Sequence, residues 1–232
     1  MSTVISFVNG KGGVGKTNLS INVAACLANL LHQKVLLIDA DDQATATTWA
    51  TNRGDNNSCG FRVVGMAREN MAQDAMAMAA DYDFTIIDAP PHAKSISRSC
   101  IIAADLVVVP IEQGGFSLWG SNWTLNQIEQ AQMIKPSLKC GYVVSRKMGS
   151  TVLGREARTL AAKKGMRVFE TEIEQRVAFC EAGTLYQTVF ENAGVSSIAA
   201  HEILSLTQEL LEVINGQELY RYTPADAAAS AV

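Results

Sequence analysis

The chain has 232 residues, and its 19 lysines and arginines against 23 aspartates and glutamates give a formal net charge of −4. A hydrophobic share of 48% can fill a sizeable core in one domain or at most two small ones, which excludes a disordered chain. The five cysteines form no C-x-x-C pair and no cluster with zinc spacing, so we expect neither a disulfide framework nor a structural zinc. We also expect no signal peptide and no membrane span, because the start of the chain is not basic and no apolar run approaches ~18 residues.

Short runs rich in β-branched residues alternate along the chain with longer helical patterns. The runs that predict strands are 3–8, 34–39, 61–64, 84–88, 106–110, 142–145 and 167–171. Helical spacing of apolar residues predicts helices over 17–31, 118–134, 151–164 and 196–214. Continuous Val and Ile runs are typical of strands covered on both faces, so the pattern predicts an α/β fold with a doubly wound, mostly parallel sheet. We expect a single domain over 1–219 and a flexible tail over 220–232.

The strongest motif lies between the first predicted strand and the first predicted helix, where residues 10–17 read GKGGVGKT and match G-x-x-x-x-G-K-[ST]. The glycines let backbone N–H groups turn inward around phosphate oxygens, and the helix N-terminus adds a partial positive charge. We expect Lys16 to reach the β- and γ-phosphates of a nucleotide and the Thr17 hydroxyl to ligate Mg²⁺. The predicted nucleotide-binding residues are Gly10, Lys11, Gly12, Gly13, Val14, Gly15, Lys16, Thr17 and Asn18.

The sequence KGGVGKT at 11–17 resembles the deviant Walker A pattern, K-G-G-x-G-K-[ST], of the ParA/MinD/NifH group of P-loop ATPases. The resemblance implies a P-loop NTPase architecture that uses ATP, ADP and Mg²⁺. In that group the first lysine crosses a dimer interface to the nucleotide of the other subunit, so the resemblance also implies an ATP-sandwich homodimer in which Lys11 acts across the interface. The chain is most similar to a small, ParF-like plasmid partition ATPase without an N-terminal DNA-binding domain.

Two predicted strands end in aspartate where the resemblance requires carboxylates. The second strand runs into Asp39-Ala-Asp41-Asp42-Gln, close to the D-x-D-P-Q of ParA proteins, with Asp42 in place of proline. The fourth strand ends in Asp88 before Ala-Pro-Pro, which is similar to the D-x-P-P of Walker B and switch II. A carboxylate there can hold magnesium or orient water. The resemblance implies a metal-binding set of Thr17, Asp39 and Asp88. It implies a catalytic set of Lys11, Lys16, Asp39 and Asp41, with Asp41 positioning the water.

A basic segment follows the sixth predicted strand. Residues 146–167 include seven basic residues and one acidic residue, whereas the rest of the chain is acidic. Clustered positive charge is the electrostatic footprint of binding to a phosphate backbone, and without a groove-reading motif we expect DNA binding to be independent of sequence. The alternative is a solubilising surface helix. The candidate DNA contacts are Arg146, Lys147, Arg155, Arg158, Lys163, Lys164 and Arg167.

The C-terminal helical pattern distinguishes a MinD-like ATPase from a ParA-like one. MinD-like ATPases end in a basic amphipathic membrane helix, whereas residues 201–219 contain glutamates and no lysine or arginine, so an anionic membrane would repel them. The apolar residues of this segment are predicted to pack on the core. We therefore expect no membrane partner and a cytoplasmic protein that associates with the nucleoid in its ATP-bound state.

The resemblance to the ParA/MinD group implies a ParA-type ATPase. Its ATP-bound dimer would bind DNA nonspecifically, and a ParB-like or centromere-binding adaptor would stimulate hydrolysis, so that repeated cycles partition or position a cargo such as a plasmid. Three other classes stay open. They are a MinD-like membrane-associated positioning ATPase, a redox protein of the iron–sulfur reductase type and a nucleotide-dependent scaffold with little turnover. The redox class needs paired cysteines at a dimer axis, and no cysteine lies close after Asp88.

Overall fold

The computed structural model describes residues 2–53, 59–113, 121–149, 159, 162 and 166–216. Its centre is a seven-stranded sheet in the order β3-β2-β4-β1-β5-β6-β7, in which every pair of neighbouring strands is parallel. The sheet confirms the seven predicted strands and the doubly wound α/β class. The strands are β1 (Thr3–Phe7), β2 (Val35–Asp39), β3 (Arg62–Gly65), β4 (Phe84–Asp88), β5 (Leu106–Ile111), β6 (Lys139–Lys147) and β7 (Val168–Glu174).

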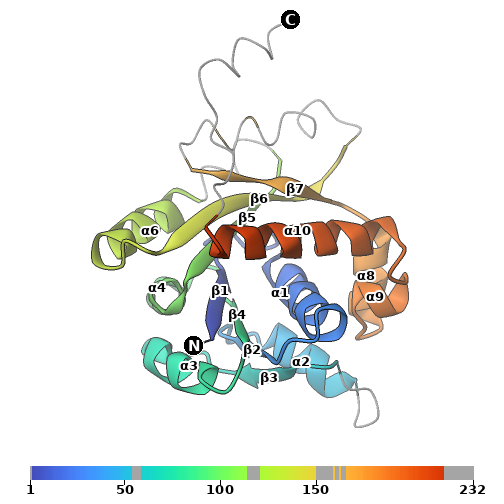
Figure 1. The fold of residues 1–232 in the computed structure, drawn as a ribbon, viewed down its shortest axis with the longest axis horizontal. Coiled ribbons are helices and arrows are strands. Elements are labelled where there is room, and N and C mark those ends of the chain that lie inside the picture. The colour runs from blue at the N-terminus through green and yellow to red at the C-terminus, as the bar shows by residue number, and fades with distance from the viewer. Residues whose placement is uncertain are drawn as a thin grey trace, which may run out of the picture.

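Helices connect the strands and cover both faces of the sheet (Figure 1). They are α1 (Lys16–Ala25), which continues as a π-helical turn (Cys26–Leu30), α2 (Thr45–Asn52), α3 (Met71–Ala79), α4 (Lys94–Ala103), α6 (Asn122–Ile134), α8 (Val177–Thr184), α9 (Val189–Asn192) and α10 (Ile198–Ile214). Helix α1 with its π-helical turn, α6 and α10 confirm three of the four predicted helices. The predicted helix over 151–164 lies almost entirely outside the described residues, and the predicted tail over 220–232 lies wholly outside them.

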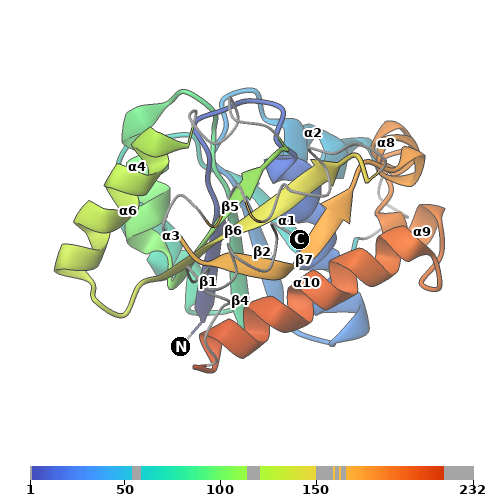
Figure 2. The same ribbon diagram turned by 90° about the horizontal axis from the view of Figure 1, so that it is seen from above.

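The sheet separates two apolar cores. Figure 2 shows α3, α4 and α6 on one side of the sheet and α1 and α10 on the other. In β1 and the residue that follows it, Ile5 and Phe7 pack in the core with α1 and α10, whereas Val4 and Val8 belong to the core with α3, α4 and α6. Full burial of such a side chain contributes about 1.5–3 kcal/mol to stability. The continuous apolar strand sequences thus reflect burial on both faces.

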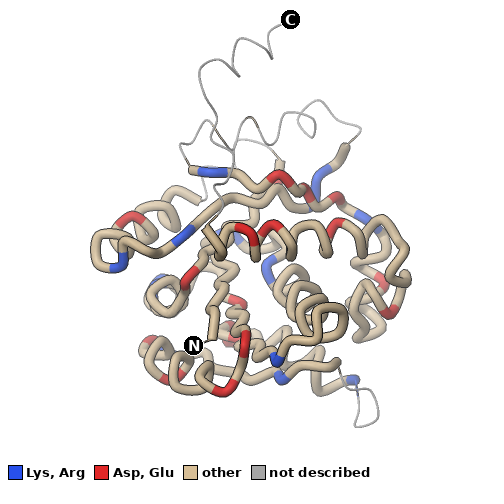
Figure 3. Tube along the Cα trace, in the orientation of Figure 1, with Lys and Arg blue, Asp and Glu red and all other residues tan. Residues whose placement is uncertain are grey.

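Helix α10 covers the α1 side of the sheet and stabilises its edge. Its apolar stripe is buried, with Ile203, Leu206 and Leu210 fully inaccessible, which confirms the predicted packing on the core. Its charged side chains are acidic (Figure 3), and the carboxylate of Glu209 accepts the backbone N–H of Thr171 in edge strand β7 at 2.9 Å. No helix among the described residues is long and apolar enough to cross a bilayer.

Strand register determines where the candidate site lies. Strand β4 lies between β1 and β2, and its Asp88 is opposite Phe7 of β1 on one side and Asp39 of β2 on the other. The loop that leaves β1 and the aspartates that end β4 and β2 therefore meet at one edge of the sheet. In open parallel sheets the ligand site lies outside the carboxyl ends of the strands.

Candidate functional site at the phosphate loop

The phosphate loop connects β1 to α1 in the conformation that its glycines predict. Gly13 and Gly15 have φ values of 78° and 88°, a left-handed region that glycine adopts at little cost. A Cβ atom added to Gly15 would also lie 2.9 Å from the hydroxyl oxygen of Ser145 at the end of β6. Glycine at position 15 therefore avoids both the strain of a left-handed backbone and a steric clash with Ser145. The loop ends at the N-terminus of α1, where free N–H groups and the helix dipole favour an anion.

Lys16 is the buried cation of this loop. Its side chain is only 6% exposed, and its Nζ donates to the carbonyl oxygen of Lys11 at 3.2 Å. Burial lowers the pKa of Lys16, while the carboxylates of Asp88 and Asp41 oppose that shift. The same interactions show that Lys16 lies within electrostatic reach of both aspartates. An ammonium group held in this way gains a full counter-charge when a phosphate enters the loop.

Asp88 presents an oxygen with no partner to the same space. Its Oδ1 accepts the hydroxyl of Ser20 at 3.5 Å, and among the described residues its buried Oδ2 has no hydrogen-bond partner. Burial raises the pKa of Asp88 to about 7; Asp39 and Asp41 add to the shift, and the Thr17 hydroxyl and Lys16 oppose it. A carboxylate oxygen beside a threonine hydroxyl is a donor pair that suits Mg²⁺. No group of three or more His, Cys, Asp or Glu residues in the described part of the chain could hold a metal alone.

Asp39 is as buried as Asp88, but both of its oxygens are occupied. Oδ2 accepts the backbone N–H of Thr47 at 2.9 Å and the Thr47 hydroxyl at 3.1 Å, and Oδ1 accepts the N–H of Asp41 at 3.2 Å. Asp39 therefore joins the first turn of α2 to the loop that contains Asp41. This geometry gives Asp39 an organising contact that the sequence did not indicate.

Asp41 lies in that loop, less buried than Asp39. Its Oδ1 accepts the N–H of Gln43 at 3.1 Å. Burial raises the pKa of Asp41; the Gln43 N–H opposes the shift, and Asp42 and Asp39 add to it. The structure thus brings the four predicted residues Lys16, Asp39, Asp41 and Asp88 to one end of the sheet.

Lys11 has a partner that the sequence analysis missed. Its Nζ forms an ion pair with Oε2 of Glu112 at 2.8 Å, and Oε1 of Glu112 lies 3.4 Å from the guanidinium of Arg146. Arg146 also donates to the carbonyl oxygen of Gly13 at 2.7 Å. Glu112 directly follows β5, which lies beside β1 in the sheet, so the strand order could have pointed to this residue.

The described part of the basic segment does not form a shared open face. Arg146 contacts the phosphate loop, and Lys147, only 17% exposed, forms an ion pair with Glu172 of β7. Arg167 precedes β7 and also has an interaction partner. Arg155, Arg158, Lys163 and Lys164 lie outside the described residues. Their role in DNA binding stays a prediction.

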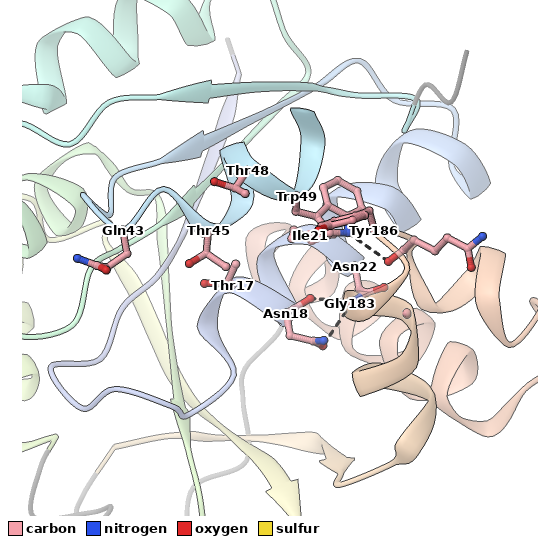
Figure 4. A pocket seen from close by; sticks show the side chains of 12 residues that line it. Thr17, Asn18, Ile21, Asn22, Gln43, Thr45, Thr48, Trp49, Gly183 and Tyr186 are labelled. Carbon is pink, nitrogen blue, oxygen red and sulfur yellow. Dashed lines mark hydrogen bonds between the residues drawn. The ribbon is translucent and has the colours of Figure 1, made fainter. Parts of the chain in front are cut away.

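A pocket of about 450 Å³ opens beside Thr17 and Asn18. Figure 4 shows α1 and α2 contributing to its walls, with Trp49 near Tyr186. The Trp49 Nε1 donates to the carbonyl oxygen of Gln187 at 3.3 Å, which connects α2 to the segment after α8. No charged side chain lines this pocket. The lining residues are Thr17, Asn18, Ile21, Asn22, Gln43, Thr45, Thr48, Trp49, Ala182, Gly183, Tyr186 and Gln187.

A parallel sheet with a glycine-rich loop after β1, a buried lysine in that loop and aspartates from two neighbouring strands defines a P-loop nucleotide-binding protein. The chain matches the sequence model of the CobQ/CobB/MinD/ParA nucleotide binding domain over residues 5–189. It belongs to that family, which confirms the resemblance to the ParA/MinD group at this broader level.

Individual relatives within the family have several functions. The chain is 26% identical to the maintenance of carboxysome distribution protein A of Halothiobacillus neapolitanus, over 89% of this chain and 95% of that protein. It is 30% identical to the chromosome-partitioning ATPase Soj of Thermus thermophilus, over 89% of this chain and 94% of that protein. The cobyrinic acid a,c-diamide synthase of Mycobacterium smegmatis, solved with an ATP analogue and magnesium, has the same fold, with a TM-score of 0.78 and 22% identity over 97% of this chain and all of that one. The comparisons therefore do not single out the ParF-like plasmid type.

Proposed function

We propose that the protein is a ParA-type ATPase, with residues 1–219 as one ATPase domain, that binds ATP and Mg²⁺ at the phosphate loop and hydrolyses the nucleotide. The observation that carries this proposal is the position of the unpartnered Asp88 Oδ2 and the buried Lys16 beside the preformed loop. Among the described residues Asp88 Oδ2 has no hydrogen-bond partner and Lys16 donates to a neutral carbonyl oxygen, and a magnesium-bound triphosphate would supply a charged partner to each.

Each residue has a separate task in this proposal. The loop N–H groups and Lys16 hold the phosphates, and Thr17 and Asp88 would hold magnesium, which neutralises charge on the β- and γ-phosphate oxygens. Asp41 orients the attacking water. Asp39 acts through the loop, because its contacts with Thr47 and the Asp41 N–H hold Asp41 in place. Positioning and charge neutralisation account for most of phosphoryl-transfer catalysis.

The finer part of the proposal is a cycle. ATP joins two copies of the chain, Lys11 reaches the nucleotide of the partner subunit, and the dimer binds DNA nonspecifically until a ParB-like adaptor stimulates hydrolysis. Association with the nucleoid would follow from DNA binding by the ATP-bound form. The basic segment at 146–167 and the relatives named for chromosome partitioning and carboxysome distribution support a role in moving or spacing a cargo, with a plasmid as one candidate. The membrane-associated alternative gains no support from α10, whose apolar face is buried in the core.

The test is a measurement of molar mass by light scattering with ATP, with ADP and without nucleotide, combined with an ATP turnover assay with and without duplex DNA. We expect a dimer only with ATP, and we expect Lys11→Ala to weaken dimerisation while the monomer still binds nucleotide. Lys16→Ala is the control that loses nucleotide binding altogether, because it removes the buried phosphate-facing charge. If the Lys11→Ala protein dimerises as wild type does, Lys11 has no role across the interface. Dimerisation without measurable turnover would favour the scaffold alternative.

A further inference from the structure

Three charged side chains from distant parts of the sequence meet at the mouth of the phosphate loop. Lys11 belongs to the loop, Glu112 follows β5, and Arg146 lies near the end of β6. One carboxylate contacts both cations, through Oε2 to Lys11 at 2.8 Å and through Oε1 toward Arg146 at 3.4 Å. The side chain of Glu112 is 25% exposed and that of Lys11 is 36% exposed, so solvent and a ligand can reach the cluster.

The backbone of Arg146 is strained in the conformation that aims its side chain at the loop. Its φ is 54°, and the pairing of β6 with β7 shifts register between Val144 and Lys147. A residue with a side chain held in this region costs about 1–3 kcal/mol, and such strain gathers at binding sites and switches. Here it places the guanidinium against the carbonyl oxygen of Gly13, at 2.7 Å, directly over the loop that receives phosphates.

The two cations of the cluster form a site for an anion, and the carboxylate of Glu112 is the anion that they bind. Ammonium and guanidinium groups bind carboxylate and phosphate oxygens with similar geometry, so either anion can be their partner. In the nucleotide-free chain the only carboxylate that the described residues place on both cations is that of Glu112. A polyphosphate entering the loop brings several negative charges toward the same two cations and toward Glu112 itself.

We infer that Glu112 competes with the phosphates of the nucleotide for Lys11 and Arg146, and that Arg146 is a further phosphate-binding residue. The inference rests on the proposed function, because the competing ligand is the polyphosphate of ATP. Glu112 holds both cations in this structure, and nucleotide binding releases them from the carboxylate. The affinity for nucleotide is therefore lower than it would be if Glu112 did not bind these two cations.

The decisive variant is Glu112→Gln, which keeps the shape of the side chain and removes its charge. We expect it to bind ATP about tenfold more tightly than wild type, and to bind tripolyphosphate, a probe without base or ribose, more tightly as well. Glu172→Gln is the matched control, since Glu172 has similar exposure (20%) and is paired with Lys147 on the neighbouring strand rather than with Lys11 or Arg146. Its affinity should equal that of wild type.

Arg146→Gln separates competition from simple charge repulsion. It should weaken ATP binding on its own, and the gain from Glu112→Gln should shrink in the Arg146→Gln background, because only Lys11 is left to release. An equal gain in both backgrounds would leave repulsion between Glu112 and the phosphates as the full explanation and overturn the inference.

A second readout needs no nucleotide. Amine-reactive labelling of the empty protein, quantified by mass spectrometry, should modify Lys11 severalfold more in Glu112→Gln than in wild type, with exposed Lys94 as the internal reference. If wild type binds ATP but Glu112→Gln binds it no more tightly, the inference fails and the proposed function stands. If wild type binds neither ATP nor tripolyphosphate, both fail, whatever the labelling shows.

Discussion

Two buried aspartates, Asp39 and Asp88, lie opposite each other on neighbouring strands, yet their contacts differ. Asp39 accepts three hydrogen bonds from its own loop and from α2, whereas one oxygen of Asp88 has no partner among the residues that the structure describes. A carboxylate whose hydrogen bonds are complete organises the backbone, and one that lacks a partner is free to take a cation. The difference supports the proposal that Asp88 takes the cation and that Asp39, also predicted as a magnesium ligand, acts mainly by positioning its loop.

Asp88 should make the stability of the nucleotide-free, magnesium-free protein depend on pH. Its pKa is about 7 in the folded chain, above the value of about 3.9 for an unfolded chain. Because the folded pKa is raised, the stabilising contribution is complete below the unfolded pKa and is lost as pH rises through about 7. Asp88→Asn removes this titration. We therefore expect the stability of wild type relative to Asp88→Asn, from urea unfolding, to fall by a few kcal/mol between about pH 4 and pH 8. A constant difference would contradict the raised pKa.

Asp41 should control hydrolysis more than binding. Asp41→Ala removes the carboxylate near Lys16 but leaves the loop N–H groups and Lys16 in place. We expect steady-state turnover of ATP to fall on the order of 10²-fold while the affinity for ATP changes little, and the ATP-bound dimer to persist. Asp42→Ala, a change to the next residue in the same loop, is the control and should keep most of the turnover. Normal turnover in Asp41→Ala would move the water-positioning role to another residue.

At the scale of elements, a largely buried ion pair joins Arg53, the residue after α2, to Glu191 of α9. Arg53, whose side chain is 2% exposed, contacts both carboxylate oxygens of Glu191 and lies 4.8 Å from the Trp49 ring. Removing one partner of a buried pair leaves an uncompensated charge and costs about 3–5 kcal/mol. Because Glu191 is itself 34% exposed, we expect Glu191→Gln to destabilise the fold by about 1–3 kcal/mol in urea unfolding.

The chain offers a matched control for that measurement. Arg68 and Asp74 form an ion pair of similar length, 2.7 Å, with both side chains more than half exposed. Asp74→Asn should change stability by less than about 1 kcal/mol, because water screens the pair. Equal effects in Asp74→Asn and Glu191→Gln would show that burial of Arg53 does not matter.

Strands were easier to predict from this sequence than short helices. Each buried strand is a continuous apolar run, a signal contained within a few neighbouring residues. Helices α2 (TATTWATN) and α4 (KSISRSCIIA) are rich in Thr or Ser, which have low helix propensity, and eight to ten residues are too few to be stable alone. Packing on the sheet stabilises them, through Trp49 in α2 and Cys100 and Ile101 in α4, so their sequences alone did not predict them.

The candidate site likewise has parts that the sequence predicted and parts that it did not. The phosphate loop and the aspartates after β2 and β4 were predictable, because a local motif and the alignment of parallel strand ends suffice to bring them together. The contacts of Glu112 with Lys11 and Arg146 and the pocket at Trp49 were not predicted. Lys11 and Glu112 are 101 residues apart, and Trp49 bonds to Gln187 across 138 residues, so these contacts depend on how whole elements pack.

At the scale of the whole molecule, the prediction about DNA binding rests on how charge is distributed along the chain. The protein is acidic overall, so attraction to a phosphate backbone has to come from the basic segment at 146–167. We predict that the ATP-loaded protein binds unrelated duplexes with similar affinity, and that this affinity falls steeply as salt is raised. Each phosphate contact should contribute about one unit to the slope of log affinity against log salt.

Charge reversal of Arg155, Arg158 and Lys163 to glutamate tests this directly. We expect the triple variant to lose DNA binding and keep ATP binding. The salt slope of a dimer should fall by about three to six units if each subunit contributes up to three contacts. The control reverses exposed Lys34, Arg62 and Arg68, which changes the net charge equally at a different place in the sequence. ATP should matter in either case, because a dimer carries two basic segments and gains affinity through effective concentration. Titrations at several salt concentrations with ATP, ADP and no nucleotide measure all of these effects.

If the Arg155, Arg158 and Lys163 variant binds DNA as wild type does, the segment is a solvated surface. If wild type with ATP binds no DNA at low salt, DNA-dependent positioning is the wrong mechanism for this chain.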